Sequence, residues 1–361
     1  MTSASGGGRL VGPVEVIGVG LIGTSIALAC SRAGLEVLLS DKDPDHVRTA
    51  SGLGAGRARQ AGDIPQLVVV AVPPDHLGST IREALDSAGP ATVVTDVGSV
   101  KESPLRTVEG HPRASQYVGS HPMAGTERSG PLTAFADLFD GRPWAITAGP
   151  RATASAVQVV EDLVALCGGV VVRLTPVEHD RAVARTSHVP HLMSALVAGT
   201  LAGASPAHLA LSGQGVRDVT RVAGGDARLY SQIIGGNAAA VGALLTELRS
   251  RLDLAIDAVT GGDRDGLASL LLQGNVGTQA IPGKHGGPLR PMSAVRVAVP
   301  DHPGELARLF ADAGDSGVNI EDVRIDHDPG RDYGLVELDV ETAAAPELVG
   351  ALEARGWAVQ R

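Results

Sequence analysis

The fold of the first part of this chain is decided by the stretch Val14-Glu-Val-Ile-Gly-Val-Gly-Leu-Ile-Gly23. Its β-branched beginning, residues 14–17, predicts a short strand, and three glycines follow at the spacing G-x-G-x-x-G. The alanine-rich run 24–33 then predicts a helix that ends at Gly34. A glycine loop between a strand and a helix presents backbone N–H groups and the positive end of the helix dipole to phosphate. This stretch therefore predicts a dinucleotide site.

The residues of this loop have separate physical tasks in such a site. Gly18 permits a tight turn, Gly20 lets the backbone approach the pyrophosphate, and Gly23 allows the helix to pack on the strand. The cofactor-binding residues expected in the loop are Gly18, Gly20, Leu21, Ile22 and Gly23.

Asp41 follows the second predicted strand, residues 35–40, and is the acidic residue that a dinucleotide site requires after its glycine loop. A carboxylate at this place hydrogen-bonds the 2′-hydroxyl of the adenosine ribose and repels a 2′-phosphate. Asp41 therefore favours NAD over NADP as the cofactor, and the nearby Lys42 and Arg48 weaken that preference.

Further apolar runs predict the rest of a sheet. They cover residues 67–72, 92–95, 117–119 and 144–148, and they alternate with helical patterns. The alternation predicts an α/β fold with a doubly wound, Rossmann-type parallel sheet, whose ligand lies beyond the carboxyl ends of the strands. Val72, at the end of the third strand, is then expected beside the nicotinamide ribose.

Chemically useful side chains follow the fourth and fifth strands. The segment Asp96-Val-Gly-Ser-Val-Lys101 is expected to bring Ser99 and Lys101 to the ligand-facing edge, and His121 follows the fifth strand. An imidazole titrates near neutral pH and suits a general base that takes a proton beside a nicotinamide. The alternative for His121 is an imidazole that is solvated or satisfied within the core.

The pattern changes near Thr175 to helical spacing, without a convincing strand up to about residue 272. The segment Thr175-Pro-Val-Glu178 predicts a capping box with proline at the first helical position. Arg221 is the candidate clamp for a substrate carboxylate, because a guanidinium binds a carboxylate through two hydrogen bonds. Its alternative is an ordinary structural ion pair.

The composition argues against several classes of protein. With 43% hydrophobic residues among 361, the chain can form sizeable cores. The net charge of −10, without a block of Lys and Arg, argues against a nucleic-acid partner. Cys30 and Cys167 stand in apolar helical contexts, and residues 1–8 are small and polar, so we expect a cytoplasmic protein with reduced thiols.

Two features of the helical part have simpler interpretations than they first suggest. Residues 192–211 carry almost no charge, but their Gly, Ser and Pro residues predict buried interface helices rather than a membrane span. His188 and His191 lack a third ligand at a useful spacing, so we expect no metal site.

A further unit begins near Ser293, after a Gly- and Pro-rich segment. Its elements alternate in the order β-α-β-β-α-β, which predicts a ferredoxin-like arrangement. The expected strands are residues 295–299, 319–326, 335–340 and 357–359, and the expected helices end at Ala313 or span 346–355.

The order of the motifs along residues 13–275 is specific. They are Gly18-Val-Gly-Leu-Ile-Gly23, Asp96-Val-Gly-Ser-Val-Lys101, His121-Pro-Met-Ala-Gly-Thr-Glu127, His179-Asp180, Ser187-His-Val-Pro-His191 and Asp218-Val-Thr-Arg-Val-Ala223. This order resembles that of the prephenate dehydrogenase family, which includes arogenate dehydrogenases. Residues 294–361, with Asp301-His-Pro-Gly-Glu-Leu306 and Gly317-Val-Asn-Ile320, resemble an ACT domain, a small-ligand regulatory module.

The resemblance implies a reaction and a set of roles. The reaction is the oxidative decarboxylation of prephenate to 4-hydroxyphenylpyruvate in tyrosine biosynthesis, with NAD reduced. His121 would act as the general base, with Ser99 hydrogen-bonded to the same centre and also near the cofactor. The residues implied to line the substrate pocket are Arg221, His191, Thr126, Glu127, His179 and Asp180. The helical part is implied to form a homodimer.

Other functions are compatible with parts of this pattern. Arogenate dehydrogenase, which makes tyrosine directly, is the nearest, because Tyr230 stands where the resemblance leads us to expect a tryptophan of the pocket lining. A non-catalytic amino-acid-binding regulator and a generic hydroxyacid or imine reductase are the others. The presence of both Ser99 and His121 argues against the regulator, and Arg221 argues against the generic reductase.

The ACT-like unit has two interpretations. In one it binds an aromatic amino acid that regulates the enzyme allosterically, and in the other it only dimerises through its edge strands. The effector-binding residues implied by the first are Asp301, His302, Gly304, Asn319 and Ile320. The domain organisation predicted overall is a tail over 1–12, an NAD-binding domain over 13–174, a helical domain over 175–275, a linker over 276–292 and the ACT domain over 293–361.

Overall fold

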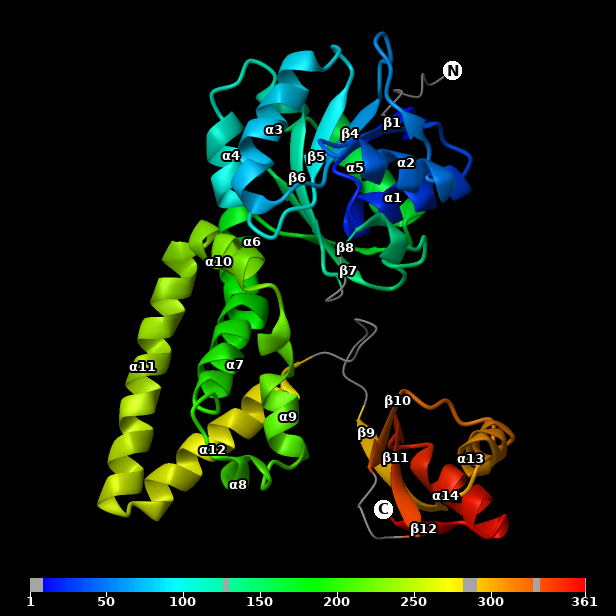
Figure 1. The fold of residues 1–361 in the computed structure, drawn as a ribbon, viewed down its shortest axis with the longest axis vertical. Helices are drawn as coiled ribbons and strands as arrows, with labels where there is room; N and C mark the ends of the chain where they lie inside the picture. Colours follow the sequence, from blue (N-terminus) through cyan, green and yellow to red (C-terminus); the bar gives the residue numbers. More distant parts are fainter. Residues whose placement is uncertain (1–8, 126–129, 282–290, 327–331, 361) are drawn as a thin grey trace, which may run out of the picture. The chain divides into compact units, whose positions relative to one another are not determined.

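The computed structural model describes residues 9–125, 130–281, 291–326 and 332–360. The chain divides into two compact units, residues 1–273 and residues 274–361, which are described separately. The first unit contains a large sheet followed by a group of helices, and the second contains a small sheet with two helices (Figure 1).

The first unit is built on an eight-stranded sheet of order β3-β2-β1-β4-β5-β6-β7-β8. The order of β3 to β6 is that of a dinucleotide-binding sheet, with its switch point between β1 and β4. The strands are β1 (Val14–Ile17), β2 (Val37–Ser40), β3 (Arg57–Ala58), β4 (Leu67–Val70), β5 (Val93–Asp96), β6 (Tyr117–Pro122), β7 (Pro143–Ala148) and β8 (Val170–Arg173).

The sheet is not parallel throughout, which corrects the prediction. The strands from β3 to β6 run parallel, but β7 pairs with β6 in the antiparallel direction and β8 then runs parallel to β7. A parallel neighbour needs a long crossover, usually a helix. In its described part, the connection from β6 to β7 holds only a short 3-10 turn, Pro131–Thr133, so it does not supply one.

Helices cover both faces of this sheet. Alternate residues of β4 point to opposite faces: Leu67 and Val69 belong to the core that includes α1 and α5, whereas Val68 and Val70 belong to the core formed with α3 and α4. This two-sided burial explains why the strand sequence is continuously apolar. The helices are α1 (Leu21–Arg32), α2 (Pro44–Gly52), α3 (Pro74–Ser87), α4 (Glu102–Val108) and α5 (Ala154–Leu166).

The helical part begins at the predicted capping box. The Thr175 hydroxyl accepts a hydrogen bond from Glu178 N at 3.2 Å, and the Glu178 carboxylate accepts one from Thr175 N at 2.9 Å. The helices are α6 (Pro176–Val183), a π-helical turn (Ala184–His188), α7 (Val189–Gly199), α8 (Pro206–Leu209), α9 (Gln214–Thr220), a 3-10 turn (Arg221–Gly224), α10 (Ala227–Gly236), α11 (Ala238–Gly261) and α12 (Arg264–Gln279). Because α12 continues to Gln279, the first residues of the predicted linker are helical.

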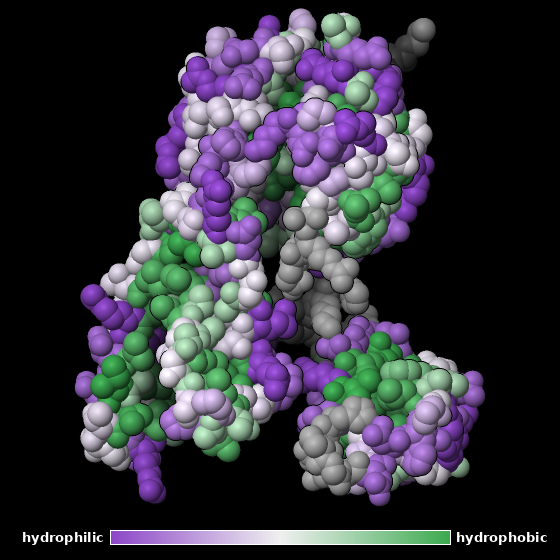
Figure 2. All heavy atoms as spheres, viewed as in Figure 1, coloured by the Kyte–Doolittle hydropathy of each residue, from purple (hydrophilic) through white to green (hydrophobic). Residues whose placement is uncertain are grey.

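Much apolar surface remains exposed on these helices, as the green areas over α11 and α12 in Figure 2 show. Of the 24 residues of α11, only Val241 and Ala258 are buried within the chain. None of the helices in the described ranges combines the length and the hydropathy that crossing a membrane requires.

The second unit has the predicted order of elements. They are β9 (Met292–Pro300), α13 (Glu305–Gly314), β10 (Asp322–Asp326), β11 (Tyr333–Glu341), α14 (Ala345–Ala354) and β12 (Ala358–Gln360). The sheet order is β10-β11-β9-β12, and every neighbouring pair is antiparallel. Alternate residues of β9 and β11, such as Val297 and Leu338, pack against both helices and Trp357 to form a separate core.

Candidate active site

The glycine loop between β1 and α1 has the geometry that a bound pyrophosphate requires. Gly18 has a φ of +95°, which favours glycine, and a Cβ on Gly23 would lie 1.9 Å from the Gly18 carbonyl oxygen. A Cβ on Gly20 would meet no atom of the chain within 4 Å. Gly18 and Gly23 therefore serve the packing of the loop, whereas Gly20 leaves open space at the amino end of α1, where the N–H groups of Leu21 and Ile22 lie.

Two further predicted cofactor residues border this loop. One carboxylate oxygen of Asp41, at the end of β2, accepts a hydrogen bond from Val19 N at 2.8 Å. Val72 follows β4, and its Cγ1 lies 3.2 Å from the Cβ position of Gly18. The structure therefore brings Asp41 and Val72 to the same edge of the sheet as the glycine loop.

His121 lies at the carboxyl end of β6 and is partly exposed. Ser99 lies in the loop between β5 and α4, and within the described part of the chain its hydroxyl has no hydrogen-bond partner. Because β5 and β6 are parallel neighbours, Ser99 and His121 both lie toward the carboxyl edge of the sheet, where the glycine loop also lies. A partly exposed imidazole and an unengaged hydroxyl at this edge are available to a ligand.

His121 is the first member of a chain of hydrogen bonds that leads into the helical part. Its Nδ1 lies 2.9 Å from His179 Nε2, and His179 Nδ1 lies 2.8 Å from Asp180 Oδ1. The two imidazole rings meet edge to face, with centroids 5.2 Å apart. His179 and Asp180 are both buried, so they lie behind His121 and contact other residues of the chain.

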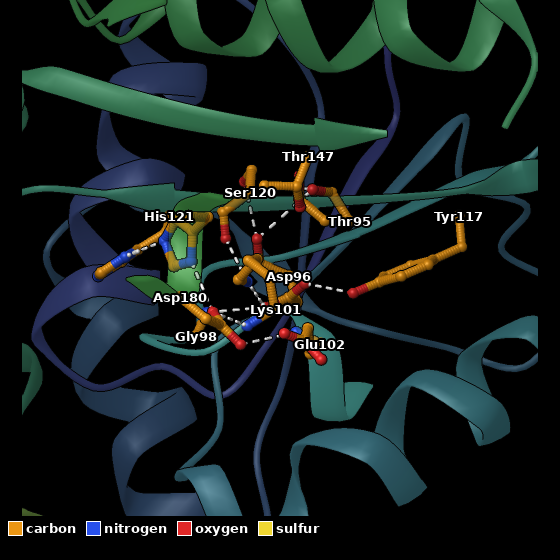
Figure 3. Close-up of polar contacts among 12 residues, drawn as sticks. Thr95, Asp96, Gly98, Lys101, Glu102, Tyr117, Ser120, His121, Thr147 and Asp180 are labelled. Atoms are coloured by element: carbon orange, nitrogen blue, oxygen red, sulfur yellow. Dashed lines mark hydrogen bonds and ion pairs between the residues drawn. The ribbon is translucent and has the colours of Figure 1, made fainter. Parts of the chain in front are cut away.

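Asp180 also contacts the loop that carries Ser99. Its carboxylate oxygens accept hydrogen bonds from Lys101 N at 2.8 Å and Glu102 N at 2.9 Å, at the start of α4 (Figure 3). Asp180 thus supplies the cap that the amino end of α4 lacks from its own side chains.

Lys101 does not face the ligand edge, contrary to the prediction. Its side chain is fully buried, forms an ion pair with Asp96, and donates a hydrogen bond to the Ser120 carbonyl at 2.6 Å (Figure 3). Tyr117 donates to the other oxygen of Asp96 at 2.7 Å. The physical reason is that a buried ammonium requires a paired carboxylate, and Asp96 at the end of β5 supplies it.

The electrostatic environment keeps the imidazoles of the site neutral. Burial, with smaller effects from His179 and Lys101, holds the pKa of His121 well below its ordinary value. Burial also lowers the pKa of His179 and brings the pKa of His188 to about 4. At neutral pH, His121 therefore carries a free lone pair and can accept a proton.

A second group of polar side chains lies on the helices. The rings of His191 and Tyr230 are stacked, with centroids 3.3 Å apart and planes 6° from parallel. His191 Nδ1 and Ser194 Oγ are buried without hydrogen-bond partners in the described structure. Arg221 is exposed in the 3-10 turn that packs against α7, and its guanidinium has no ion-pair partner among the described residues.

The other predicted site residues fall into two groups. Thr126 and Glu127 lie outside the described residues. The predicted effector residues belong to the second unit: Asp301 and His302 are exposed before α13, Gly304 has a φ of +97°, and Asn319 donates to Glu321 at 2.6 Å beside Ile320. No group of three His, Cys, Asp or Glu side chains in the described ranges has the geometry of a metal site.

Some residues that support the site carry no signal in the local sequence. Asn237 donates to the Asp180 carbonyl at 2.7 Å and lies 3.2 Å from His188 Nδ1, so the junction of α10 and α11 holds α6. No local pattern marks Asn237 as a partner of a residue 57 positions away. The stacking of Tyr230 on His191 was equally hidden, because it depends on how α7 and α10 pack.

Family models match most of the first unit. The nucleotide-binding domain of prephenate dehydrogenase matches residues 26–173, and the dimerization domain of prephenate dehydrogenase matches residues 175–273. The matched ranges begin after the glycine loop, so the geometry of that loop is separate evidence for a dinucleotide site. Residues 274–361 lie outside both ranges.

Individual relatives agree with this assignment. The chain is 36% identical over 355 residues to "Probable prephenate dehydrogenase NovF" of Streptomyces niveus, covering 95% of this chain and 98% of the relative. It is 30% identical over 264 residues to the cyclohexadienyl dehydrogenase of Zymomonas mobilis, covering 70% of this chain and 90% of the relative.

Solved structures share the fold of the first unit. Synechocystis arogenate dehydrogenase has a TM-score of 0.63 and 26% identity, over 73% of this chain and 98% of that structure. Prephenate dehydrogenase from Aquifex aeolicus, solved with hydroxyphenyl propionate and NAD+, has a TM-score of 0.68 and 24% identity, over 74% of this chain and 98% of that structure. From the matches to both domain models and the identity to full-length relatives, we conclude that this chain belongs to the prephenate dehydrogenase family.

Proposed function

We propose that this protein catalyses the NAD-dependent oxidative decarboxylation of prephenate to 4-hydroxyphenylpyruvate. The observation that carries the proposal is a neutral, partly exposed His121 at the same sheet edge as a glycine loop with open space at Gly20. Membership of the prephenate dehydrogenase family supports the same reaction and the same cofactor.

The reaction needs one proton acceptor beside the nicotinamide. Hydride leaves the ring carbon that carries the hydroxyl and reduces NAD, while His121 takes the hydroxyl proton and a carbonyl forms. The bond to the ring carboxylate then breaks, carbon dioxide leaves, and the electron pair of that bond makes the ring aromatic. The oxygen regains a proton as a phenol, which protonated His121 can supply. Ser99 is available to hydrogen-bond the same oxygen.

The protein contributes positioning and charge placement rather than an electron sink. Arg221 is an exposed guanidinium without a protein carboxylate among the described residues, so it is available to a carboxylate of prephenate. His191, with its unpartnered Nδ1, is proposed to lie near the side-chain end of the substrate. Thr126 and Glu127 are proposed pocket residues from the family motif alone.

The test follows the formation of reduced nicotinamide with prephenate and the full chain. Turnover is expected with NAD, and the carboxylate of Asp41 predicts a lower kcat/KM with NADP. Replacement of His121 by Asn is expected to lower kcat about 10²–10⁴-fold, because a positioned general base is lost, while the affinity for NAD is kept. Absence of turnover with prephenate at every pH between about 6 and 9, the range over which an imidazole base acts, would contradict the proposal.

Arogenate is the second candidate substrate, favoured by the fold shared with Synechocystis arogenate dehydrogenase and by Tyr230 beside the proposed pocket. Arogenate carries an ammonium group where prephenate carries a keto group. The ratio of kcat/KM for the two compounds under identical conditions decides between them, and we expect it to favour prephenate.

The helical part is proposed to form a homodimer. Its family model is a dimerization domain, and α11 exposes apolar residues such as Leu252, Ile256 and Val259 along one stripe. Such a stripe on an isolated chain needs a partner surface. A second copy of the same helices supplies one.

The second unit is proposed to be an ACT-type regulatory domain with a ferredoxin-like fold. The support is its element order, its antiparallel sheet of order β10-β11-β9-β12, and the loop at Gly304 that precedes α13. Isothermal titration of the full chain with tyrosine and with phenylalanine tests for an effector. Heat of binding that Asp301→Ala abolishes supports the effector role, and no binding of either amino acid leaves dimerisation as the role of the unit.

A further inference from the structure

In each hydrogen bond behind His121, one group is the donor and the other is the acceptor. These roles can be assigned by starting from Asp180. Asp180 accepts hydrogen bonds from two backbone N–H groups, those of Lys101 and Glu102, so its carboxylate is placed as an acceptor. Burial alone would raise the pKa of Asp180. The hydrogen bonds from His179 and from the two backbone groups outweigh burial, and they hold the pKa below its ordinary value.

An ionised Asp180 fixes the proton of each imidazole in turn. His179 Nδ1, 2.8 Å from Asp180 Oδ1, must carry a proton in order to donate to it. A neutral His179 then has a lone pair on Nε2, and His121 Nδ1 at 2.9 Å must donate to that lone pair. A neutral His121 with its proton on Nδ1 has its remaining lone pair on Nε2, the nitrogen that makes no hydrogen bond within the described chain.

We propose that His179 and Asp180 are positioning residues, which hold His121 in the tautomer that accepts the substrate proton at Nε2 and stabilise the imidazolium formed by that transfer. This assignment rests on the proposed function, and it replaces the direct contact with substrate that the sequence implied for both residues. Both lie behind His121 and are at most 2% exposed. Their polar atoms already have partners within the chain.

The same carboxylate also positions the second group of the site. Through Lys101 N and Glu102 N, Asp180 holds the start of α4 and therefore the end of the loop that carries Ser99. One buried anion on α6 thus fixes both the ring of the base and the strand-to-helix loop beside it.

In a catalytic triad, a buried carboxylate orients the imidazole that acts as the base. Here a second imidazole, that of His179, lies between the base and the carboxylate. When the proton reaches Nε2, His121 becomes positively charged. The dipole of His179 and the negative charge of Asp180 stabilise that positive charge. No proton has to leave His179 for this stabilisation. Changes to His179 or Asp180 are therefore expected to alter kcat and the pH profile rather than the binding of NAD or prephenate.

The first test reads the tautomer without any turnover. The full chain is labelled with nitrogen-15 in histidine, and the His121 signals are assigned by comparison with His121→Asn. The proposal predicts a protonated Nδ1 and an unprotonated Nε2 for His121 at neutral pH. A protonated Nε2 would overturn it, whatever the substrate of the enzyme is.

The second test uses a matched series of variants in the full chain. His179→Leu removes the acceptor for His121 Nδ1, and kcat with prephenate is expected to fall about 10²–10⁴-fold with unchanged affinity for NAD. His179→Gln offers an amide oxygen to His121 Nδ1 and is expected to recover part of that loss. Asp180→Asn keeps an acceptor for His179 but removes the charge, so the acid limb of the kcat/KM profile is expected to move to lower pH.

The control is Asp86→Asn, which removes an exposed carboxylate that lies 3.0 Å from the buried His111, away from the hydrogen bonds of His121, His179 and Asp180. It is expected to keep kcat and the pH profile. Thermal melts identify a variant that fails to fold, and the tautomer measurement on the wild-type chain decides the proposal in that case. If the wild type turns over and His179→Leu has the same kcat, the positioning role of His179 is overturned. Absence of wild-type turnover would overturn the proposed function instead.

Discussion

At the scale of single residues, His121 combines a reactive position with a pKa that burial has lowered. A lowered pKa means that the neutral, proton-accepting ring persists to lower pH than an unperturbed imidazole would. The acid limb of the kcat/KM profile, which reports the free enzyme, is therefore expected below about pH 6.5. Initial rates across the acid range measure it. An acid limb above that pH would show that the rate depends on a different group.

Arg221 is the proposed clamp for a carboxylate of the substrate. Its guanidinium is exposed and has no ion-pair partner in the described chain, so Arg221→Gln should leave the melting temperature unchanged. We expect KM for prephenate to rise about 10- to 100-fold, because a charged hydrogen bond to the substrate is lost. Arg217→Gln, an exposed arginine on the preceding helix, is the matched control. An unchanged KM would show that Arg221 does not bind the substrate.

The place of a site residue could be predicted from the sequence only where the neighbouring residues in the chain determine it. The glycines of the loop and Asp41 follow strands directly, so their place at the sheet edge followed from the motif. Lys101 lies five residues after Asp96, which ends β5, and was expected at the ligand-facing edge. It turns inward because Asp96 and the Ser120 carbonyl offer it partners. The partnership of His179 with His121 spans 58 positions, and no local pattern contains it.

At the scale of elements, the junction of β1 and α1 separates folding from binding. A Cβ on Gly23 would lie 1.9 Å from a backbone oxygen, whereas a Cβ on Gly20 would meet no atom of the chain within 4 Å. Gly23→Ala is therefore expected to lower the free energy of unfolding by about 2 kcal/mol or more, the cost of overpacking a tight contact.

Gly20→Ala is the matched variant for the same loop. It should keep the stability of the wild type and weaken NAD, because the added methyl group occupies the space that the pyrophosphate approaches. Chemical denaturation and NAD titration of both variants separate the two effects. A Gly20→Ala variant with unchanged NAD affinity would show that the dinucleotide does not bind against this loop.

The direction of β7 could not be predicted, because it depends on the connection that precedes the strand and not on the residues of the strand. Residues 143–148 have the apolar pattern of a buried strand, and that pattern is the same for both directions. Their reversal depends on the connection from β6, whose described part has no crossover helix. The capping box was predictable because all of its atoms come from Thr175 and Glu178.

At the scale of the whole molecule, the apolar stripe on α11 predicts the oligomeric state. The wild-type chain is expected to have the mass of two chains by light scattering after size-exclusion chromatography. The double variant Leu252→Asp with Ile256→Asp places two charges on the stripe, and it is expected to have the mass of one chain. Ile64→Asp changes an apolar residue that is more exposed than either of these and lies outside the helical part; it is the control and should stay dimeric. A wild-type monomer would contradict the dimer.

The organisation of the whole chain was predictable to different degrees. The change from alternating strands to helices marked the start of the helical part, since Thr175 combines a cap with a break in strand periodicity. The order of elements in the second unit also followed from alternation and turns. The end of α12 did not, because Gly274 and Gly277 suggest a linker although the helix runs through both.

We propose that His121 Nε2 receives the proton of the substrate hydroxyl. A crystal structure of the full chain with NAD and 4-hydroxyphenylpyruvate tests it most directly, because the phenol oxygen of this product is the former alcohol oxygen. We expect that oxygen to lie about 2.6–3.2 Å from Nε2, with Nδ1 still hydrogen-bonded to His179 and the nicotinamide facing the same ring. A phenol oxygen held by another side chain, with the imidazole of His121 turned away from it, would show that His121 is not the base.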